Sequence, residues 1–341
     1  MLLCAYVFGH CDAITDEDAK MLDLINIAFG LIRDGRLFVP ESAASPVWER
    51  LRAANPSLRV LLSIGGWGAG GFSTMAKSQT ARQVFIDSCL SAVEAYGLDG
   101  LDLDWEYPTI DSAGIDADPA DRENFTALLT ELRAALDTRY PDTHKMLTIA
   151  AGGGDYYINA VEIPKLVPVL DYISVMTYDL AGLHVPAMHH TALYSTALQP
   201  NSVDANVKRF MAAGAPAEKL VIGAAFYSRR WLHIPDGGTH GLGQSETIRD
   251  PGSGGFGPGF GTLSAMRGRD GFTAYRDETA HAPYLYNAET GEWLSYDDPE
   301  SVAEKVRYAK EHGLCGVMYW EHGCDPTRAL LDALYTAKNE G

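Results

Sequence analysis

The sequence lacks an apolar run of the roughly 20 residues that a membrane-spanning helix needs, so no such helix is expected. Basic residues are also in deficit, because 27 Lys and Arg stand against 45 Asp and Glu, for a net charge of −18. An acidic chain repels phosphate backbones and anionic lipids, so neither nucleic acid nor a membrane is expected as a partner. The negative charge does not exclude neutral substrates.

Cysteine is scarce, and the five cysteines form no recognisable framework. They are Cys4, Cys11, Cys89, Cys315 and Cys324. An odd number with this spacing fits neither paired disulfides nor a zinc site, so we expect reduced thiols in a reducing compartment. The apolar segment at residues 1–8 has no basic residue before Lys20 and no small-residue cleavage site, which favours a buried strand over a signal peptide. The chain as given is therefore expected to be cytoplasmic, or secreted if a longer precursor was trimmed.

No metal or cofactor is expected. The ten histidines, including His189, His190 and His322, show no metal-ligand spacing and are expected at the surface or in loops. Residues 66–71 satisfy the G-x-G-x-x-G pattern of dinucleotide sites, but a second match at residues 252–257 shows how easily a glycine-rich chain produces it.

Eight short aliphatic runs recur at intervals that suit alternating strands and helices. They lie near residues 2–8, 24–29, 59–64, 98–105, 146–151, 172–176, 220–226 and 314–319. Helices are indicated between several of them, from Ser78 to Gly97, over residues 121–140, and from Asp298 to Gly313. Apolar strands separated by helices predict an α/β fold, the (β/α)8 TIM barrel, whose active site lies at the carboxyl ends of the strands.

The regular alternation breaks for about seventy residues after Trp231. PYLYNAETGEWLSY reads there as two short strands joined by a glycine-containing turn. We expect a small α+β insertion at residues 232–294, between strands seven and eight. Residues 1–231 and 295–341 then form the catalytic barrel.

The segment LDGLDLDWEYP, residues 98–108, carries four acids and no basic residue. On a strand, Asp102, Asp104 and Glu106 point to one face, while Asp99 has the opposite parity. Folding does not require a row of three carboxylates on one face, because buried charges without partners are costly. The row therefore indicates a reaction site.

Two other interpretations of this row stay open. Acids at strand ends often cap the next helix or bind a loop lysine, and carboxylates also suit hard cations. Calcium loops, however, place their acids in turns rich in Gly and Asn, whereas Leu101, Leu103 and Trp105 give this segment a strand-like apolar back. A reaction site is favoured over both.

With the acidic strand placed on a barrel, the chain resembles glycoside hydrolase family 18, the chitinase family. The D-x-x-D-x-D-x-E hallmark is present as Asp99, Asp102, Asp104 and Glu106. Further motifs cover most of the chain: SIGGW at residues 63–67, MTYD at 176–179, LVIGAAFYSRRW at 220–231, GVMYWE at 316–321 and PYLYN with YDDPES between 283 and 301. One departure is Ser228, where glycine is usual between Tyr227 and Arg229.

The resemblance implies a retaining mechanism in which the N-acetyl oxygen of the sugar attacks the anomeric carbon. Glu106 would act as general acid and then base, and Asp104 would orient the acetamido N–H. Asp102 should share a proton with Asp104, since adjacent like charges resist joint ionisation. Tyr178 would bind the acetamido carbonyl.

The resemblance also implies a set of substrate-binding residues. They are Asp179, Trp320, Trp67, Met176, Tyr227, Arg229, Trp231, Ser63 and Tyr6. Ser63 and Tyr6 would support Asp102, although core packing explains Tyr6 equally well. Trp67 and Trp231 are expected as sugar platforms, with packing beneath the insertion as the alternative. Trp105 and Tyr107 should face away from the acids.

The expected function is hydrolysis of β-1,4 linkages between N-acetylglucosamine units of chitin or chito-oligosaccharides. An endo-β-N-acetylglucosaminidase acting on N-glycans is the alternative within the same family. Lectin-like relatives that bind chitin typically lose the acid at the position of Glu106, so its presence counts against a lectin. Chain-length preference, exo or endo action, and oligomeric state stay open.

Overall fold

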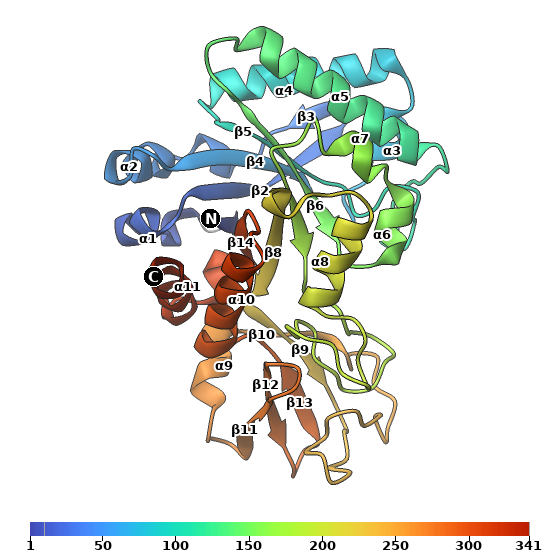
Figure 1. Cartoon of the computed structure of the whole chain (residues 1–341), viewed down its shortest axis with the longest axis vertical. Helices are drawn as coiled ribbons and strands as arrows, with labels where there is room; N and C mark the ends of the chain where they lie inside the picture. The colour runs from blue at the N-terminus through green and yellow to red at the C-terminus, as the bar shows by residue number, and fades with distance from the viewer. Residues whose placement is uncertain (10, 341) are drawn as a thin grey trace.

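A closed parallel barrel forms the larger part of the molecule (Figure 1). The computed structural model describes residues 1–9 and 11–340, and within them eight parallel strands follow one another around the barrel. They are β1 (Leu2–Phe8), β2 (Leu24–Arg33), β4 (Arg59–Gly65), β5 (Gly100–Asp104), β6 (Met146–Gly152), β7 (Tyr172–Met176), β8 (Leu220–Ala225) and β14 (Gly316–Trp320). The pairing of β1 with both β14 and β2 closes the barrel, so the predicted TIM barrel is confirmed. A short strand, β3 (Arg36–Phe38), pairs with β2 outside it.

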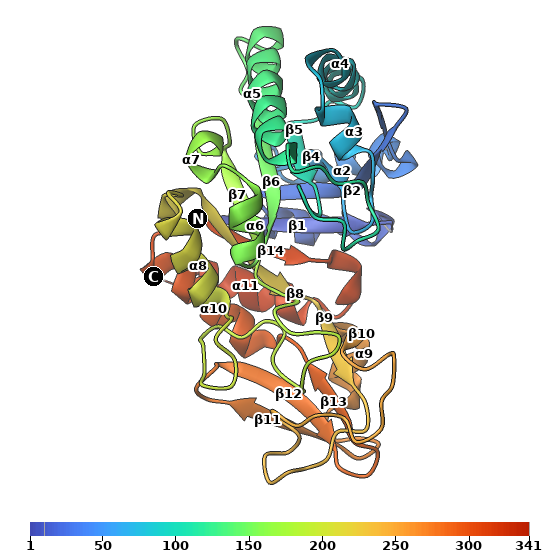
Figure 2. The same ribbon diagram turned by 90° about the vertical axis from the view of Figure 1, so that its right-hand side faces the viewer.

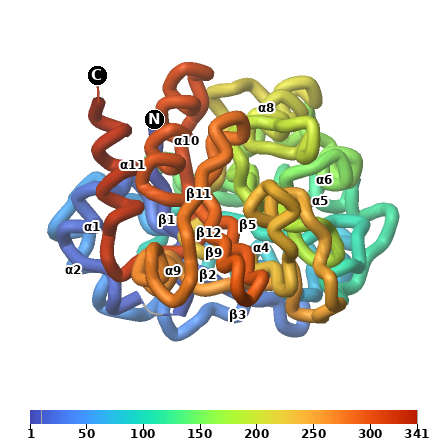
Figure 3. Tube along the Cα trace, turned by 90° about the horizontal axis from the view of Figure 1, so that it is seen from below, coloured from blue at the N-terminus to red at the C-terminus, as the bar shows by residue number. Residues whose placement is uncertain are grey.

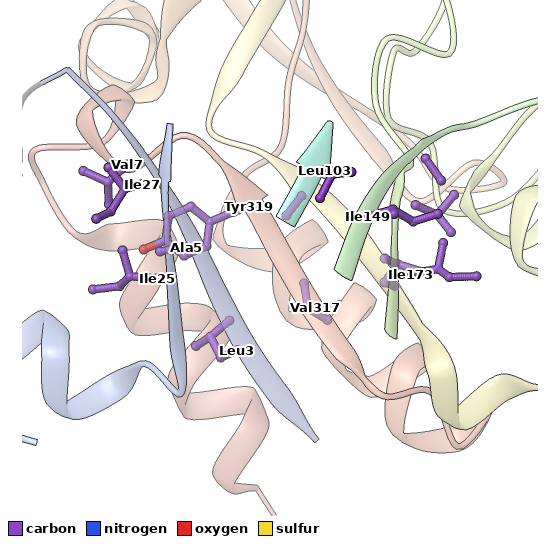
Figure 4. Close-up of a cluster of buried hydrophobic side chains, with 14 of the residues drawn as sticks. Leu3, Ala5, Val7, Ile25, Ile27, Leu103, Ile149, Ile173, Val317 and Tyr319 are labelled. Atoms are coloured by element: carbon purple, nitrogen blue, oxygen red, sulfur yellow. The ribbon is translucent and has the colours of Figure 1, made fainter. Parts of the chain in front are cut away.

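Alternation along the strands divides the buried side chains into two cores. One set faces the surrounding helices, and Figure 4 shows part of it, including Leu3, Ala5 and Val7 from β1. The other set fills the barrel interior, where Cys4 and Tyr6 alternate with that outer row. On β5 the same alternation puts Leu101 and Leu103 in the outer core, which leaves the acids of this strand facing inward.

Helices cover the outside of the barrel. They are α1 (Asp16–Met21), α2 (Val47–Ala54), α3 (Phe72–Ala76), α4 (Gln79–Ala95), α5 (Asp121–Arg139), α6 (Asp155–Ala160), α7 (Ile163–Leu166), α8 (Val203–Ala212), α10 (Pro299–Glu311) and, after the last strand, α11 (Ala329–Asn339), with 3-10 turns at Cys11–Ala13, Glu41–Ala44, Ala217–Lys219 and His322–Cys324. The predicted caps are confirmed, because Ser78 accepts from the N–H of Ala81 and Asp298 from that of Ser301. Within the described chain, no helix is long and apolar enough to cross a membrane.

A second, antiparallel sheet lies between β8 and β14 along the chain. Its order is β10 (Gly255–Gly259), β9 (Tyr227–Trp231), β13 (Glu292–Ser295), β12 (Ala282–Asn287) and β11 (Phe272–Asp277), with α9 (Phe260–Met266) after β10. Figures 1 and 2 place this sheet at the opposite end of the molecule from α4 and α5, and Figure 3 shows it from below. The segment 227–231 was expected in the barrel, but it pairs instead with β10 and β13 of the second sheet.

The position of β9 overturns one predicted site residue. Trp231 is 1% exposed, its indole N–H donates to the carbonyl of Val185, and its ring packs edge-on against Trp293 at 5.3 Å. A tryptophan enclosed in this way offers no face to a sugar. The expectation that Trp231 is a sugar platform is therefore wrong, and the packing alternative is correct.

Candidate active site

A cleft of about 1230 Å³ opens over the carboxyl ends of the barrel strands. Many of the predicted site residues line it together, namely Tyr6, Trp67, Asp104, Glu106, Met176, Tyr178, Asp179, Tyr227, Arg229 and Trp320. These residues come from distant parts of the sequence, and the barrel brings them to one mouth. This is the face of a TIM barrel where active sites are found.

Asp102 lies beneath the cleft and is held by hydroxyl groups. It is fully buried, and its Oδ2 accepts hydrogen bonds from Tyr6 Oη at 3.0 Å and Ser63 Oγ at 2.7 Å. Its Oδ1 accepts from Thr148 Oγ1 at 2.6 Å. Burial raises the pKa of Asp102, and the three hydroxyls oppose that rise by stabilising its charge. The predicted support from Ser63 and Tyr6 is confirmed, while Thr148 was missed.

Asp104 stands one step higher on β5 and is poor in partners. Its side chain is 4% exposed, and Oδ1 is buried with no hydrogen-bond partner among the described residues. Burial, followed by the charges of Glu106 and Asp102, raises the pKa of Asp104 well above its usual range. Hydroxyls stabilise the charge of Asp102, whereas Asp104 lacks such donors, so of the two carboxyls Asp104 has the more strongly raised pKa.

Glu106 reaches the cleft just beyond the end of β5. Burial raises its pKa to about 7, the charge of Asp179 adds to the rise, and the hydroxyl of Tyr107 opposes it. A carboxyl with this pKa is protonated in a large fraction of molecules at neutral pH. Such a group can give a proton to a leaving oxygen and then remove one from water.

Tyr107 does not face away from the site, contrary to expectation. It lines the cleft, with its ring 6.2 Å from that of Trp67 and 5.2 Å from that of Tyr156. The alternation of a strand no longer applies here because β5 ends at Asp104. Trp105 behaves as expected, since it is 1% exposed and packs in the outer core.

Asp179 is the centre of a polar cluster on the side of the cleft next to the second sheet. Its Oδ1 accepts from Tyr227 Oη and from Arg229 Nε, both at 2.7 Å, and the His190 ring nitrogen lies 3.5 Å away. Burial alone would raise the pKa of Asp179, but the hydrogen bonds with His190 and Arg229 have the larger effect, so the pKa lies below its usual range. Asp179 is therefore a fixed anion, and it orients Tyr227 and Arg229.

The structure also shows the surroundings of Ser228 and of the two consecutive histidines. Ser228 is buried, and its Oγ donates to the Pro258 carbonyl at 2.7 Å, so the departure from glycine ties β9 to β10 while Arg229 still reaches Asp179. His189 and His190 lie in a loop, one of the two expected places, but they are buried there, at 2% and 0% exposure. The sequence around these two histidines contains no pattern that predicts their burial beneath the second sheet.

Aromatic rings form one wall and floor of the cleft. The Trp320 ring stacks on Phe29 at 5.3 Å with an interplanar angle of 17°, and Tyr6 and Phe8 each approach it at 5.9 Å. Trp67 is 61% exposed to solvent. Flat apolar rings of this kind can stack against the apolar faces of sugars.

Further residues that line the cleft were missed in the sequence, namely Phe8, Phe29, Tyr156, Asn201 and Phe256. They lie in strands, in the short helix α6 and in a loop, and no periodic pattern distinguishes a cleft residue from a surface one at these positions. Among the described residues there is no group of three or more His, Cys, Asp or Glu side chains that could hold a metal ion.

Comparison with known families identifies this architecture. Residues 5–325 match the model of glycosyl hydrolases family 18. The chain belongs to this family. Chitinase A1 of Niallia circulans is 35% identical over 336 residues, which cover 89% of this chain and 46% of the relative, so the chain spans about half of that protein.

Two solved family 18 structures extend the comparison. A family 18 N-acetylglucosaminidase from Paenibacillus barengoltzii superposes with a TM-score of 0.94 at 45% identity, covering 98% of this chain and 99% of the other. A class V chitinase from Nicotiana tobaccum in complex with NAG4 gives a TM-score of 0.86 at 25% identity, covering 99% of each chain. The resemblance drawn from the motifs is thus confirmed.

Proposed function

We propose that this chain hydrolyses β-1,4 linkages between N-acetylglucosamine units of chito-oligosaccharides, with retention of configuration and participation of the substrate's own acetamido group. The observation that carries the proposal is the stepped row of acids on β5. Asp102 is satisfied by hydroxyls, Asp104 is buried with a raised pKa, and Glu106, whose pKa is about 7, lies at the edge of the cleft.

In the first step Glu106 donates its proton to the glycosidic oxygen as the bond to the leaving sugar breaks. Retaining enzymes with two carboxylates place them on opposite sides of the sugar. Asp104 and Glu106 instead follow one another at the end of a single strand, so the acetamido oxygen is the nucleophile that this site favours. Its attack on the anomeric carbon gives a cyclic oxazolinium ion.

Asp104 and Tyr178 are suited to stabilise that ion. Asp104 would accept a hydrogen bond from the acetamido N–H, and a proton shared with Asp102 would let it take on negative charge as the ion forms. The hydroxyl of Tyr178, which lines the cleft, would donate to the acetamido oxygen. Glu106, now ionised, then removes a proton from the water that opens the ring.

Binding of the sugar would use the aromatic rings and the cluster around Asp179. Trp320, stacked on Phe29, would support the sugar whose bond is cleaved, and Trp67 would support its neighbour on the leaving side. Asp179, with Arg229 and Tyr227, would bind hydroxyl groups. Met176 would contact the acetamido methyl.

The length of the product is the point on which the relatives differ. The 45% identical neighbour is described as an N-acetylglucosaminidase, whereas others are described as chitinases. An endo-β-N-acetylglucosaminidase that acts on N-glycans is the second candidate within the family. A lectin is disfavoured because Glu106 is present and titrates near neutral pH.

Digestion of a ladder of chito-oligosaccharides from dimer to hexamer, with product analysis over time, tests the proposal. We expect cleavage of every oligomer from the trimer upward. Release of monomer alone at each step would assign exo action like that of an N-acetylglucosaminidase, and mixed dimers and trimers would assign endo action. Failure to cleave any oligomer, with release of a high-mannose glycan from a glycoprotein, would overturn the proposal in favour of the endoglycosidase.

A further inference from the structure

A fully buried ion pair lies behind the cleft, between α10 and the end of the second sheet. The side chains of Lys305 on α10 and of Asp297, just after β13, are each 1% exposed, and Nζ and Oδ2 are 2.5 Å apart. Neither residue is among the described residues that line the cleft. Taking two charges out of water is costly, and apolar residues of similar volume often serve stability as well. Stability alone therefore does not explain the pair.

One branch of hydrogen bonds leads from the ion pair to the end of β7. Lys305 Nζ also donates to Thr191 Oγ1, and Thr191 Oγ1 donates to the carbonyl of Thr177 at 2.9 Å. The Thr177 hydroxyl is itself bound to the backbone of Gly223 on β8, at 2.7 Å to N and 3.0 Å to O. Thr177 directly precedes Tyr178, so two hydrogen bonds connect the buried ammonium to the backbone that carries this tyrosine.

A second branch leads to the end of β8. Asp297 Oδ2 accepts a hydrogen bond from the N–H of Ala225 at 2.9 Å, and its Oδ1 accepts one from Ser301 Oγ at 2.7 Å. Ala225 is the last residue of β8 and lies two positions before Tyr227. Both carboxylate oxygens are thus used to join α10 to the strand that leads into the Asp179 cluster.

We propose that Lys305 and Asp297 are positioning residues of the active site, which fix the ends of β7 and β8 and thereby the hydroxyl of Tyr178. The inference rests on the proposed function, because it assigns Tyr178 a bond that matters most at the transition state. A group with that role tolerates little displacement, whereas ground-state binding is spread over many contacts. Loosening the connection should therefore lower kcat and leave KM nearly unchanged.

Thr191→Val tests the connection with both members of the ion pair and all cleft residues still present, although Lys305 Nζ loses one hydrogen-bond acceptor. Valine has a similar shape and removes only the hydroxyl that joins Lys305 to Thr177. We expect kcat on a chito-tetramer to fall about tenfold while KM changes by less than about twofold. Tyr308→Phe is the matched control on α10, because it removes a buried hydroxyl bonded to Asp204 at 3.0 Å and should leave kcat unchanged.

The double variant Lys305→Met with Asp297→Asn separates positioning from stability. It removes both charges together, so no unpaired charge stays buried, and the asparagine carbonyl can still accept from Ala225. We expect a cooperatively folded protein whose Tm exceeds that of Lys305→Met alone, with a kcat as low as that of Thr191→Val. Wild-type kcat in Thr191→Val and in the double variant would overturn the inference.

Calorimetry distinguishes failure of this inference from failure of the proposed function. A thiazoline analogue of the oxazolinium ion should bind Thr191→Val about tenfold more weakly than wild type, while tetramer affinity in a Glu106→Gln background changes by less than about twofold. If the wild type binds neither probe, the proposed function fails and this inference falls with it. If Thr191→Val binds the analogue as tightly as wild type, only the positioning role is refuted.

Discussion

Replacing Glu106 by Gln should stabilise the protein above neutral pH. Burial raises the pKa of this carboxyl from about 4.5 to about 7. The folded state therefore binds the proton of Glu106 more tightly than the unfolded chain does. The stability that this proton contributes is fully present below pH 4.5 and is lost as the pH rises through 7. A shift of about 2.5 pH units corresponds to roughly 3 kcal/mol at 1.36 kcal/mol per unit. For a chain of this length that is an increase in Tm of about 4 °C.

Thermal unfolding of wild type and Glu106→Gln at about pH 4 and pH 8 measures the effect. The glutamine variant should melt higher than wild type at pH 8, and the two should agree at pH 4. Glu162→Gln is a control of opposite sign, because the hydrogen bond from Lys165 lowers the pKa of Glu162, and this variant should lose stability at pH 8. An equal difference between Glu106→Gln and wild type at both pH values would refute the reasoning.

Three further predictions concern the cleft. Asp104→Asn should lower kcat by about 10²-fold or more. Asp99→Asn loses a 2.9 Å ion pair with Arg52, so it should lower Tm and leave kcat unchanged; kinetics and thermal melts of both variants check this. Trp67→Ala should raise KM for tetramers without changing Tm, because this side chain is exposed. Trp231→Ala removes a buried ring and should lower the free energy of unfolding, measured with denaturant, by about 3–5 kcal/mol. Oligomers with an unacetylated glucosamine at the cleaving position should resist hydrolysis, and proton NMR should detect the β-anomer first.

Strand parity proved to be the most informative signal in the sequence. It separated Asp102 and Asp104 from Leu101 and Leu103, and the structure places the two sets on opposite faces of β5. The same rule could have found Thr148, which is paired in register with Asp102 on the neighbouring strand. The recurrence of short aliphatic runs between helix signals was sufficient to predict the eight barrel strands.

Parity failed for Tyr107, which turns into the cleft because β5 stops at Asp104. The prediction for Trp231 failed for a different reason, because β9 pairs with the second sheet and buries this side chain. Which sheet a strand joins depends on contacts between distant segments, and the sequence of the strand itself carries no such information. The burial of His190 against Asp179 has the same origin, since its cover comes from residues about a hundred positions away.

Steady-state kinetics of purified Glu106→Gln on a chito-tetramer test the central claim most directly. We expect kcat to fall by at least about 10²–10⁴-fold, because the amide keeps the shape of the acid but has no proton to transfer. Tetramer affinity, measured by calorimetry on the same sample, should stay within about twofold of the wild-type KM. Turnover near the wild-type rate would contradict the assignment of Glu106 as the general acid, and with it the proposed mechanism.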